Sequence, residues 1–214
     1  YLGMSGFSTG NVDNANNGYK LPFATVLTCG TGSFAEDQTT MSEKLFRAGS
    51  SSNPKGAVAS IGTATWNTHT LFNNIMDMGI YDGLIVDNVG TAGAALAHGK
   101  LALLNSYPTN PDDWVGAFTQ WNNLMGDPAT HLWTDTPTKF SVSHASEIYA
   151  GTNFIDVVVK DENGNNIDDA LITLWNRFIT EPINIYSNDL GEAAINLSGL
   201  SANNYTITVT KNNY

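Results

Sequence analysis

The pattern of apolar and polar residues separates a first part of the chain, with buried-strand and helical periodicity, from a second part with strand alternation. Short apolar runs at 23–28 and 57–61, bounded by proline or glycine, predict buried strands. Apolar residues at helical spacing predict helices over 42–48, 69–78, 91–107 and 111–125. This alternation of strands and helices predicts an α/β domain with a parallel-rich sheet.

Local signals predict where these helices begin and end. Ser42 is the predicted N-cap of the first helix, because its hydroxyl can accept a backbone hydrogen bond. The Tyr-Asp-Gly sequence at 81–83 predicts a turn after the second helix. Pro111 and the carboxylates behind it predict the start of the last helix. Its apolar stripe, which we expect in the core, consists of Trp114, Phe118, Trp121 and Leu124.

The composition changes near residues 134–138, which predicts a boundary between a first domain at 1–136 and a second at 137–214. In the second domain apolar and polar residues alternate, with turn residues about every ten positions. The predicted strands are 140–142, 154–159, 170–175, 183–186, 193–196 and 205–210. Short strands at this spacing predict a small antiparallel β-sandwich.

Charge and composition restrict the partners. Nine Lys and Arg residues stand against 20 Asp and Glu in 214 residues, a net charge of −11, so we expect no binding to nucleic acid or anionic membranes. Since no apolar run reaches about 18 residues, we also expect no membrane span. Surface-type positions carry Asn, Thr, Gly and Ser more than Lys and Glu, which favours a secreted, extracellular or cell-surface protein.

The single cysteine, Cys29, directly follows the first predicted strand and precedes a Gly-Thr-Gly turn. Parallel sheets carry their functional side chains just beyond the carboxyl ends of strands. Cys29 is therefore a candidate nucleophile. The alternative is a buried thiol that packs as a small apolar side chain.

Four blocks in order resemble the gingipain-like cysteine peptidase family: Leu21 to Phe34, Ser42 to Ala48, Pro54 to Thr65 and Trp121 to Pro128. The resemblance covers residues 1–136 and implies the carboxy-terminal half of a caspase-like peptidase domain. The following sandwich resembles the immunoglobulin-like domain of that family. Because a caspase-like sheet has further parallel strands, we expect partners that complete it. These are an N-terminal fragment of the same precursor or further copies of the chain.

The resemblance also assigns roles to residues. It implies that Cys29 is the nucleophile, and that the loop after the second strand forms one wall of the substrate cleft through Thr63, Thr65 and Trp66. Packing of Trp66 over a helix is the alternative. Backbone N–H groups of the turn that starts at Gly30 are the expected oxyanion donors.

A thiol nucleophile requires an imidazole nearby in space. The available histidines are His69, His98, His131 and His144. In the family the catalytic His lies on a Gly-His-Gly loop upstream of the cysteine, a position that falls on Gly3-Met4-Ser5-Gly6 or before Tyr1. Either a missing fragment supplies the base and the protein is an endopeptidase acting on proteins or peptides, or the chain is an inactive relative that forms extracellular structures or filaments. His69, which follows the cleft loop, is the expected substitute base.

We expect no cofactor and no metal. The acidic and amide-rich loop at 161–166 offers oxygen ligands that suit calcium. A hairpin turn explains the same composition, and the glycine is not where an EF-hand loop requires it.

Overall fold

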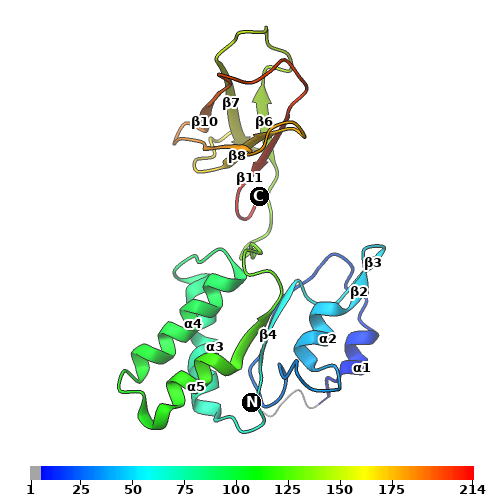
Figure 1. Cartoon of the computed structure of the whole chain (residues 1–214), viewed down its shortest axis with the longest axis vertical. Coiled ribbons are helices and arrows are strands. Elements are labelled where there is room, and N and C mark those ends of the chain that lie inside the picture. The colour runs from blue at the N-terminus through cyan, green and yellow to red at the C-terminus, as the bar shows by residue number, and fades with distance from the viewer. Residues whose placement is uncertain (1–5) are drawn as a thin grey trace. The chain divides into compact units, whose positions relative to one another are not determined.

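A computed structural model describes residues 6–214, and the chain divides into two compact units between Thr134 and Asp135 (Figure 1). In the described part of the chain, no helix is long and apolar enough to cross a membrane.

The first unit is built on a three-stranded sheet of β1 (Phe23–Val26), β4 (Ala59–Thr63) and β5 (Asn122–Met125), in the order β1-β4-β5. The strands β1 and β4 are parallel, as predicted for these two runs, and Phe23 pairs with Ala59. The strand β5 is antiparallel to β4. All five residues of β4 are buried, as expected for a central strand covered on both faces.

Helices cover this sheet on two sides (Figure 1). On one side α3, α4 and α5 share a core with Ala59 and Ile61 of β4. On the other side a smaller core joins Val26 of β1 to Leu45 of α2 and Val12 of α1. The helices are α1 (Thr9–Asp13), α2 (Met41–Arg47), α3 (Thr70–Ile85), α4 (Ala92–Ser106) and α5 (Trp114–Trp121), with a 3-10 turn η1 (Pro111–Asp113) and a small hairpin of β2 (Gly49–Ser50) and β3 (Asn53–Pro54).

The predicted cap of α2 is wrong by two residues. Thr40 is the N-cap, and its backbone N–H donates to Oε2 of Glu43 at 3.0 Å, as in a capping box. Ser42 instead lies inside the helix and is buried, and its backbone N–H donates to the carbonyl of Thr31 at 2.9 Å. The start of α2 is thereby attached to the turn that follows Cys29.

The predicted turn at 81–83 is helix, because α3 continues through it to Ile85. Gly83 is needed for packing between helices: a Cβ there would lie 2.7 Å from the ring of His98 on α4. Gly99 of α4 permits a similarly close approach, since its Cβ would lie 2.7 Å from the carbonyl of Met76. The two glycines thus let α3 and α4 pack closely.

The predicted helix 111–125 divides into three elements, η1, α5 and β5, and its last four residues form β5. Of the predicted apolar stripe, Phe118 is buried in the core, Trp121 and Leu124 pack against it, and Trp114 is exposed, which corrects the prediction for that residue. The rings of Phe118 and Trp121 lie 5.2 Å apart. The helix is capped by Asn110, whose Oδ1 accepts from the N–H of Val115 at 2.9 Å.

The second unit is a β-sandwich that contains all six predicted strands. One sheet has the order β10-β7-β6 and the other β11-β8-β9, and every pairing is antiparallel. Alternate side chains such as Val157, Ile172 and Ile195 fill the core between them. The strands are β6 (Phe140–His144), β7 (Phe154–Asp161), β8 (Leu171–Trp175), β9 (Ile183–Tyr186), β10 (Glu192–Asn196) and β11 (Thr206–Thr210).

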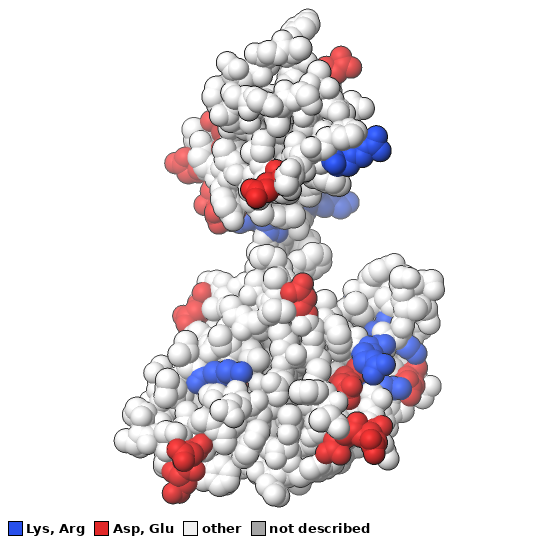
Figure 2. Space-filling view, viewed as in Figure 1, with Lys and Arg blue, Asp and Glu red and all other residues white. Residues whose placement is uncertain are grey.

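Charged side chains are sparse on the face drawn in Figure 2, where most of the surface is neutral. Basic groups of the first unit meet acidic partners near α2: Lys44 lies 2.7 Å from Asp13, and Arg47 lies 3.8 Å from Glu43. These pairs are partly exposed and contribute little to stability.

Candidate active site

Cys29 lies three residues after the end of β1, at the carboxyl edge of the parallel pair β1 and β4. Its side chain is partly buried, and its sulfur lies 2.9 Å from Oγ1 of Thr68, in the segment between β4 and α3. This places the thiol where open α/β sheets present reactive groups.

The surroundings of the thiol favour its ionised form. The Thr68 hydroxyl has the largest effect and lowers the pKa of Cys29, assisted by the Thr68 and Cys29 backbone, while burial opposes it. Hydrogen bonds to the charged form of a group stabilise that form. The hydrogen bond from Thr68 thus favours the thiolate form of Cys29.

The Gly-Thr-Gly turn behind Cys29 is bonded to the segment that continues β4. Gly30 donates its N–H to the carbonyl of Thr65 at 2.6 Å, and Gly32 donates to the carbonyl of Thr63 at 3.1 Å. The N–H of Gly30, our expected oxyanion donor, thus already has a protein acceptor. Binding of an oxyanion by this group requires that the bond to Thr65 be replaced.

Trp66 forms an exposed wall next to the thiol, with 65% of its surface accessible. A Cβ on Gly30 would lie 2.9 Å from its indole carbons, so the ring packs directly over the residue that follows Cys29. Nε1 of the indole donates to Oε1 of Glu36 at 3.2 Å. The surface that Trp66 leaves open is therefore accessible to a ligand.

The other two expected wall residues contribute differently. The side chain of Thr63 is fully buried, and its hydroxyl donates to Oδ1 of Asn122 at 2.8 Å. This corrects the expectation that Thr63 contacts a substrate, because the last residue of β4 points into the core. Thr65 is half-buried and supports the turn through its carbonyl.

His69 is exposed and is the N-cap of α3. Its Nδ1 accepts from the N–H of Leu71 at 3.2 Å, and its ring lies edge-on to Phe72 with centroids 5.7 Å apart. Among the described residues, the side-chain partner of the Cys29 sulfur is Thr68 and not an imidazole. Residues 3–5 of the predicted Gly3-Met4-Ser5-Gly6 loop lie outside the described residues.

A buried polar network that the sequence did not predict lies between the strands and helices of the first unit. Nδ2 of Asn73, on the first turn of α3, donates to the carbonyl of Leu27 at 3.0 Å. Asn122 lies beside it, donates to the carbonyl of Phe118 at 2.9 Å, and accepts from Thr63. The network joins α3 to the residue after β1, and joins β5 to β4 and α5.

His98 is engaged in contacts on α3 and the segment after it. Both ring nitrogens of His98 lie 2.8 Å from an acceptor, the carbonyl of Gly79 and Oδ2 of Asp87, and these two acceptors raise its pKa. With Asp82 these side chains form a group whose ligand atoms lie within 4.8 Å of one another among the described residues. The ion pair of His98 with Asp87 accounts for this group without a cation.

The loop at 161–166 has the contacts of a turn. Oδ1 of Asp161 accepts from the N–H groups of Asn163 and Asn165, both at 2.8 Å, and Oδ2 accepts from the Asn165 amide. These bonds, the Asn165 side chain first, lower the pKa of Asp161. The carboxylate thus stabilises the turn itself.

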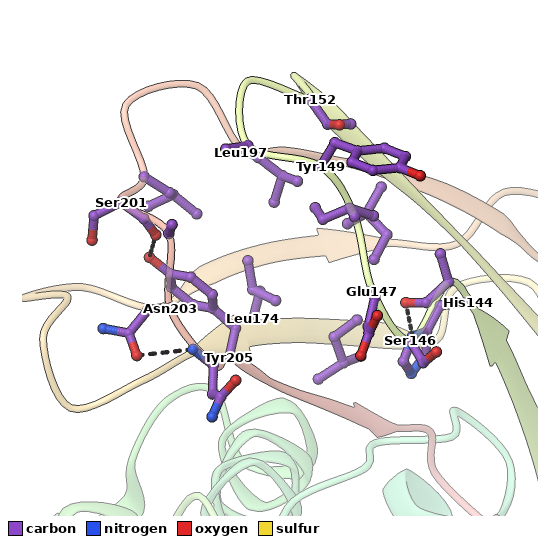
Figure 3. A pocket seen from close by; sticks show the side chains of 18 of the residues that line it. His144, Ser146, Glu147, Tyr149, Thr152, Leu174, Leu197, Ser201, Asn203 and Tyr205 are labelled. Carbon is purple, nitrogen blue, oxygen red and sulfur yellow. Dashed lines mark hydrogen bonds between the residues drawn. The ribbon is translucent and has the colours of Figure 1, made fainter.

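The second unit has a cavity of about 470 Å³ between the segment after β6 and the segment before β11 (Figure 3). Figure 3 shows Leu174 and Leu197 between the two segments, with Tyr149 on one side and Tyr205 on the other. The hydroxyl of Tyr205 donates to the carbonyl of Ser201 at 3.0 Å. This cavity is lined by residues of the second unit only, so it is separate from the Cys29 site.

The chain thus combines an α/β unit, whose single thiol follows a parallel strand, with a β-sandwich. The model of peptidase family C25 matches residues 3–133, and the chain belongs to this family. No curated protein matches the chain.

Solved structures agree with this fold. The chain is similar to the Arg-specific cysteine proteinase gingipain R (RgpB), with TM-score 0.81 and 24% identity over 99% of this chain and 48% of that chain. The complex of Porphyromonas gingivalis RgpB pro- and mature domains gives the same values. A structure described as a protease gives TM-score 0.77 and 16% identity over 97% and 48%. The chain therefore spans about half the length of these structures.

Proposed function

We propose that the first unit carries the nucleophile of a cysteine endopeptidase of extracellular location. The observation that carries the proposal is the hydrogen bond between Cys29 and Thr68 at the strand end, which favours a thiolate beside the exposed wall of Trp66. In this function the thiolate of Cys29 attacks the peptide carbonyl, forms a thioester and expels the amine, and water then hydrolyses the thioester.

The amine leaves as a neutral group only when an acid protonates it, so an imidazole has to be supplied. We assign it to an N-terminal segment of the same precursor, with His69 as the substitute within this chain. The position of His69 one residue after Thr68 supports the substitute role, but its Nδ1 already accepts the Leu71 N–H. Only Nε2 of its ring remains for proton transfer.

Oxyanion stabilisation in this proposal uses the backbone N–H of Gly30 after its bond to the Thr65 carbonyl opens. Substrate contacts come from Trp66 and the backbone at Thr65. The complex of RgpB pro- and mature domains is a precedent for pairing between parts of one precursor in a protein of this fold.

The test compares two electrophiles of equal intrinsic reactivity, a peptidyl chloromethyl ketone and the same warhead without a peptide. We expect the peptidyl reagent to modify Cys29 many-fold faster, with one adduct per chain by mass spectrometry. The variant Cys29→Ala is the control for labelling elsewhere. Equal rates for the two reagents would show that the thiol has no peptide-binding cleft and would overturn the proposal.

A second candidate function is a non-catalytic relative that forms extracellular structures or filaments by self-association. It is favoured by the observation that, in the described part of the chain, the sulfur is bonded to a hydroxyl rather than an imidazole. Native mass spectrometry distinguishes the two candidates. A complex with a second polypeptide from the precursor supports the peptidase, and high-mass particles of this chain alone support the structural role.

A further inference from the structure

We propose that Thr68 is a catalytic residue of this site, whose hydroxyl donates a hydrogen bond to the Cys29 sulfur and stabilises it as the nucleophilic thiolate. The inference rests on the proposed peptidase function, within which it assigns how the nucleophile is kept ionised.

The geometry supports a donor role for the hydroxyl. Oγ1 of Thr68 lies 2.9 Å from Sγ of Cys29, within hydrogen-bond distance. A thiolate has only lone pairs to offer, so in the ionised state the Thr68 O–H must be the donor. A hydrogen bond to a charged acceptor is about twice as strong as one between neutral groups.

The fold fixes Thr68 beside the sulfur. It lies two residues before Thr70, where α3 begins, and the N-cap contact between His69 and Leu71 holds this end of the helix. Asn73 ties the first turn of the same helix to the carbonyl of Leu27, two residues before Cys29. The donor and the sulfur are thus attached to each other through both the helix and the strand.

The Thr68 hydroxyl makes the largest contribution to the lowered pKa of Cys29. Among the described residues, the groups that act on the thiol are the Thr68 hydroxyl, the Thr68 and Cys29 backbone and burial. None of these groups is a charged side chain. A single substitution of Thr68 therefore removes the largest contribution to the lowered pKa of Cys29.

The test measures the alkylation rate of Cys29 by iodoacetamide against pH in the full chain. The wild-type midpoint is expected below the ordinary thiol value of about 8.5. Thr68→Val, which replaces the hydroxyl by a methyl group of similar size, is expected to raise the midpoint by about one to two pH units. Thr68→Ser keeps the hydroxyl and is expected to retain the wild-type midpoint.

An unchanged midpoint in Thr68→Val overturns the inference, and so does a Thr68→Ser midpoint that moves as far as that of Thr68→Val. Circular dichroism shows whether each variant is folded. Thr68→Ala provides the same comparison if the valine variant does not fold.

This experiment is independent of the peptidase test because iodoacetamide carries no peptide. If the peptidyl reagent labels Cys29 faster but Thr68→Val leaves the alkylation midpoint unchanged, only the role of Thr68 is refuted. If Thr68→Val raises the midpoint but the peptidyl reagent labels no faster than the warhead alone, only the peptidase function is refuted.

Discussion

Gly32→Ala is expected to displace the turn behind Cys29 from β4. A Cβ at Gly32 would lie 2.5 Å from the carbonyl carbon of Gly62 and 2.7 Å from its oxygen. Both are backbone atoms of a buried central strand, so no side chain can rotate away. Gly32, unlike Gly30 with φ of +71°, does not have a left-handed backbone, and the effect of the substitution is therefore steric.

The magnitude follows from this overlap. Ordinary contacts begin at about 3.4 Å, so the two backbones must separate by roughly 0.9 Å. Overpacking of this kind costs about 1–3 kcal/mol, and weakening the bond from Gly32 to the Thr63 carbonyl adds about 0.5–1.5 kcal/mol. We expect the free energy of unfolding of the first unit to fall by about 1.5–4.5 kcal/mol.

The assay is urea unfolding followed by tryptophan fluorescence, since four of the five tryptophans lie in the first unit. Gly116→Ala is the matched control. It adds the same methyl group inside α5, where the nearest atom is Nδ2 of Asn110 at 3.8 Å, and it should stabilise by about 0.5–1 kcal/mol. Equal effects of the two substitutions would refute the close packing of the turn against β4.

Two further predictions concern polar contacts of the first unit. Thr63→Val leaves the buried Oδ1 of Asn122 without its hydroxyl donor, so the free energy of unfolding in urea should fall by about 1–3 kcal/mol. Thr63→Ser keeps the hydroxyl and should lower it less. Equal losses in the two variants would count against the hydrogen bond. The Gly79 carbonyl, and after it Asp87, raise the pKa of His98 in the folded protein above its ordinary value. The protonated side chain therefore stabilises the fold fully below about pH 6.5, and this contribution is lost as the pH rises through the folded pKa. The pair is partly exposed, so about 0.2–1 kcal/mol should disappear between acidic and alkaline urea titrations and be absent in His98→Gln; the same pH dependence in both proteins would contradict it.

The sequence predicted those elements whose local pattern matches their tertiary environment. The strands β1 and β4 are short apolar runs between proline and glycine, and the six sandwich strands alternate over a two-sided core. The strand β5 was missed because it follows α5 without a breaker and Leu124 extends the helical stripe. The true cap of α2 did carry a signal, since Thr40 and Glu43 have the spacing of a capping box.

The candidate site was predictable at Cys29 and not at its partner. Thr68 is 39 residues from Cys29 in the chain, and their contact arises from the pairing of β1 with β4 and the start of α3. Thr63 is buried because its side chain, on the last residue of β4, points into the core. The neighbouring residues in the sequence do not show which way this side chain points. The asparagine network was missed because Asn73 and Asn122 occupy positions where the apolar pattern predicts no polar contact.

The most direct test of the central claim, that Cys29 is a peptidase nucleophile, is acylation by a peptidyl 4-nitrophenyl ester. Nitrophenolate leaves without a proton, so the thiolate alone suffices and no imidazole is needed for this step. We predict a burst of one nitrophenolate per chain and a peptidyl thioester on Cys29 by mass spectrometry, with neither in Cys29→Ala. A burst of the same size in Cys29→Ala, or acylation at the same rate by an ester without a peptide, would contradict the claim.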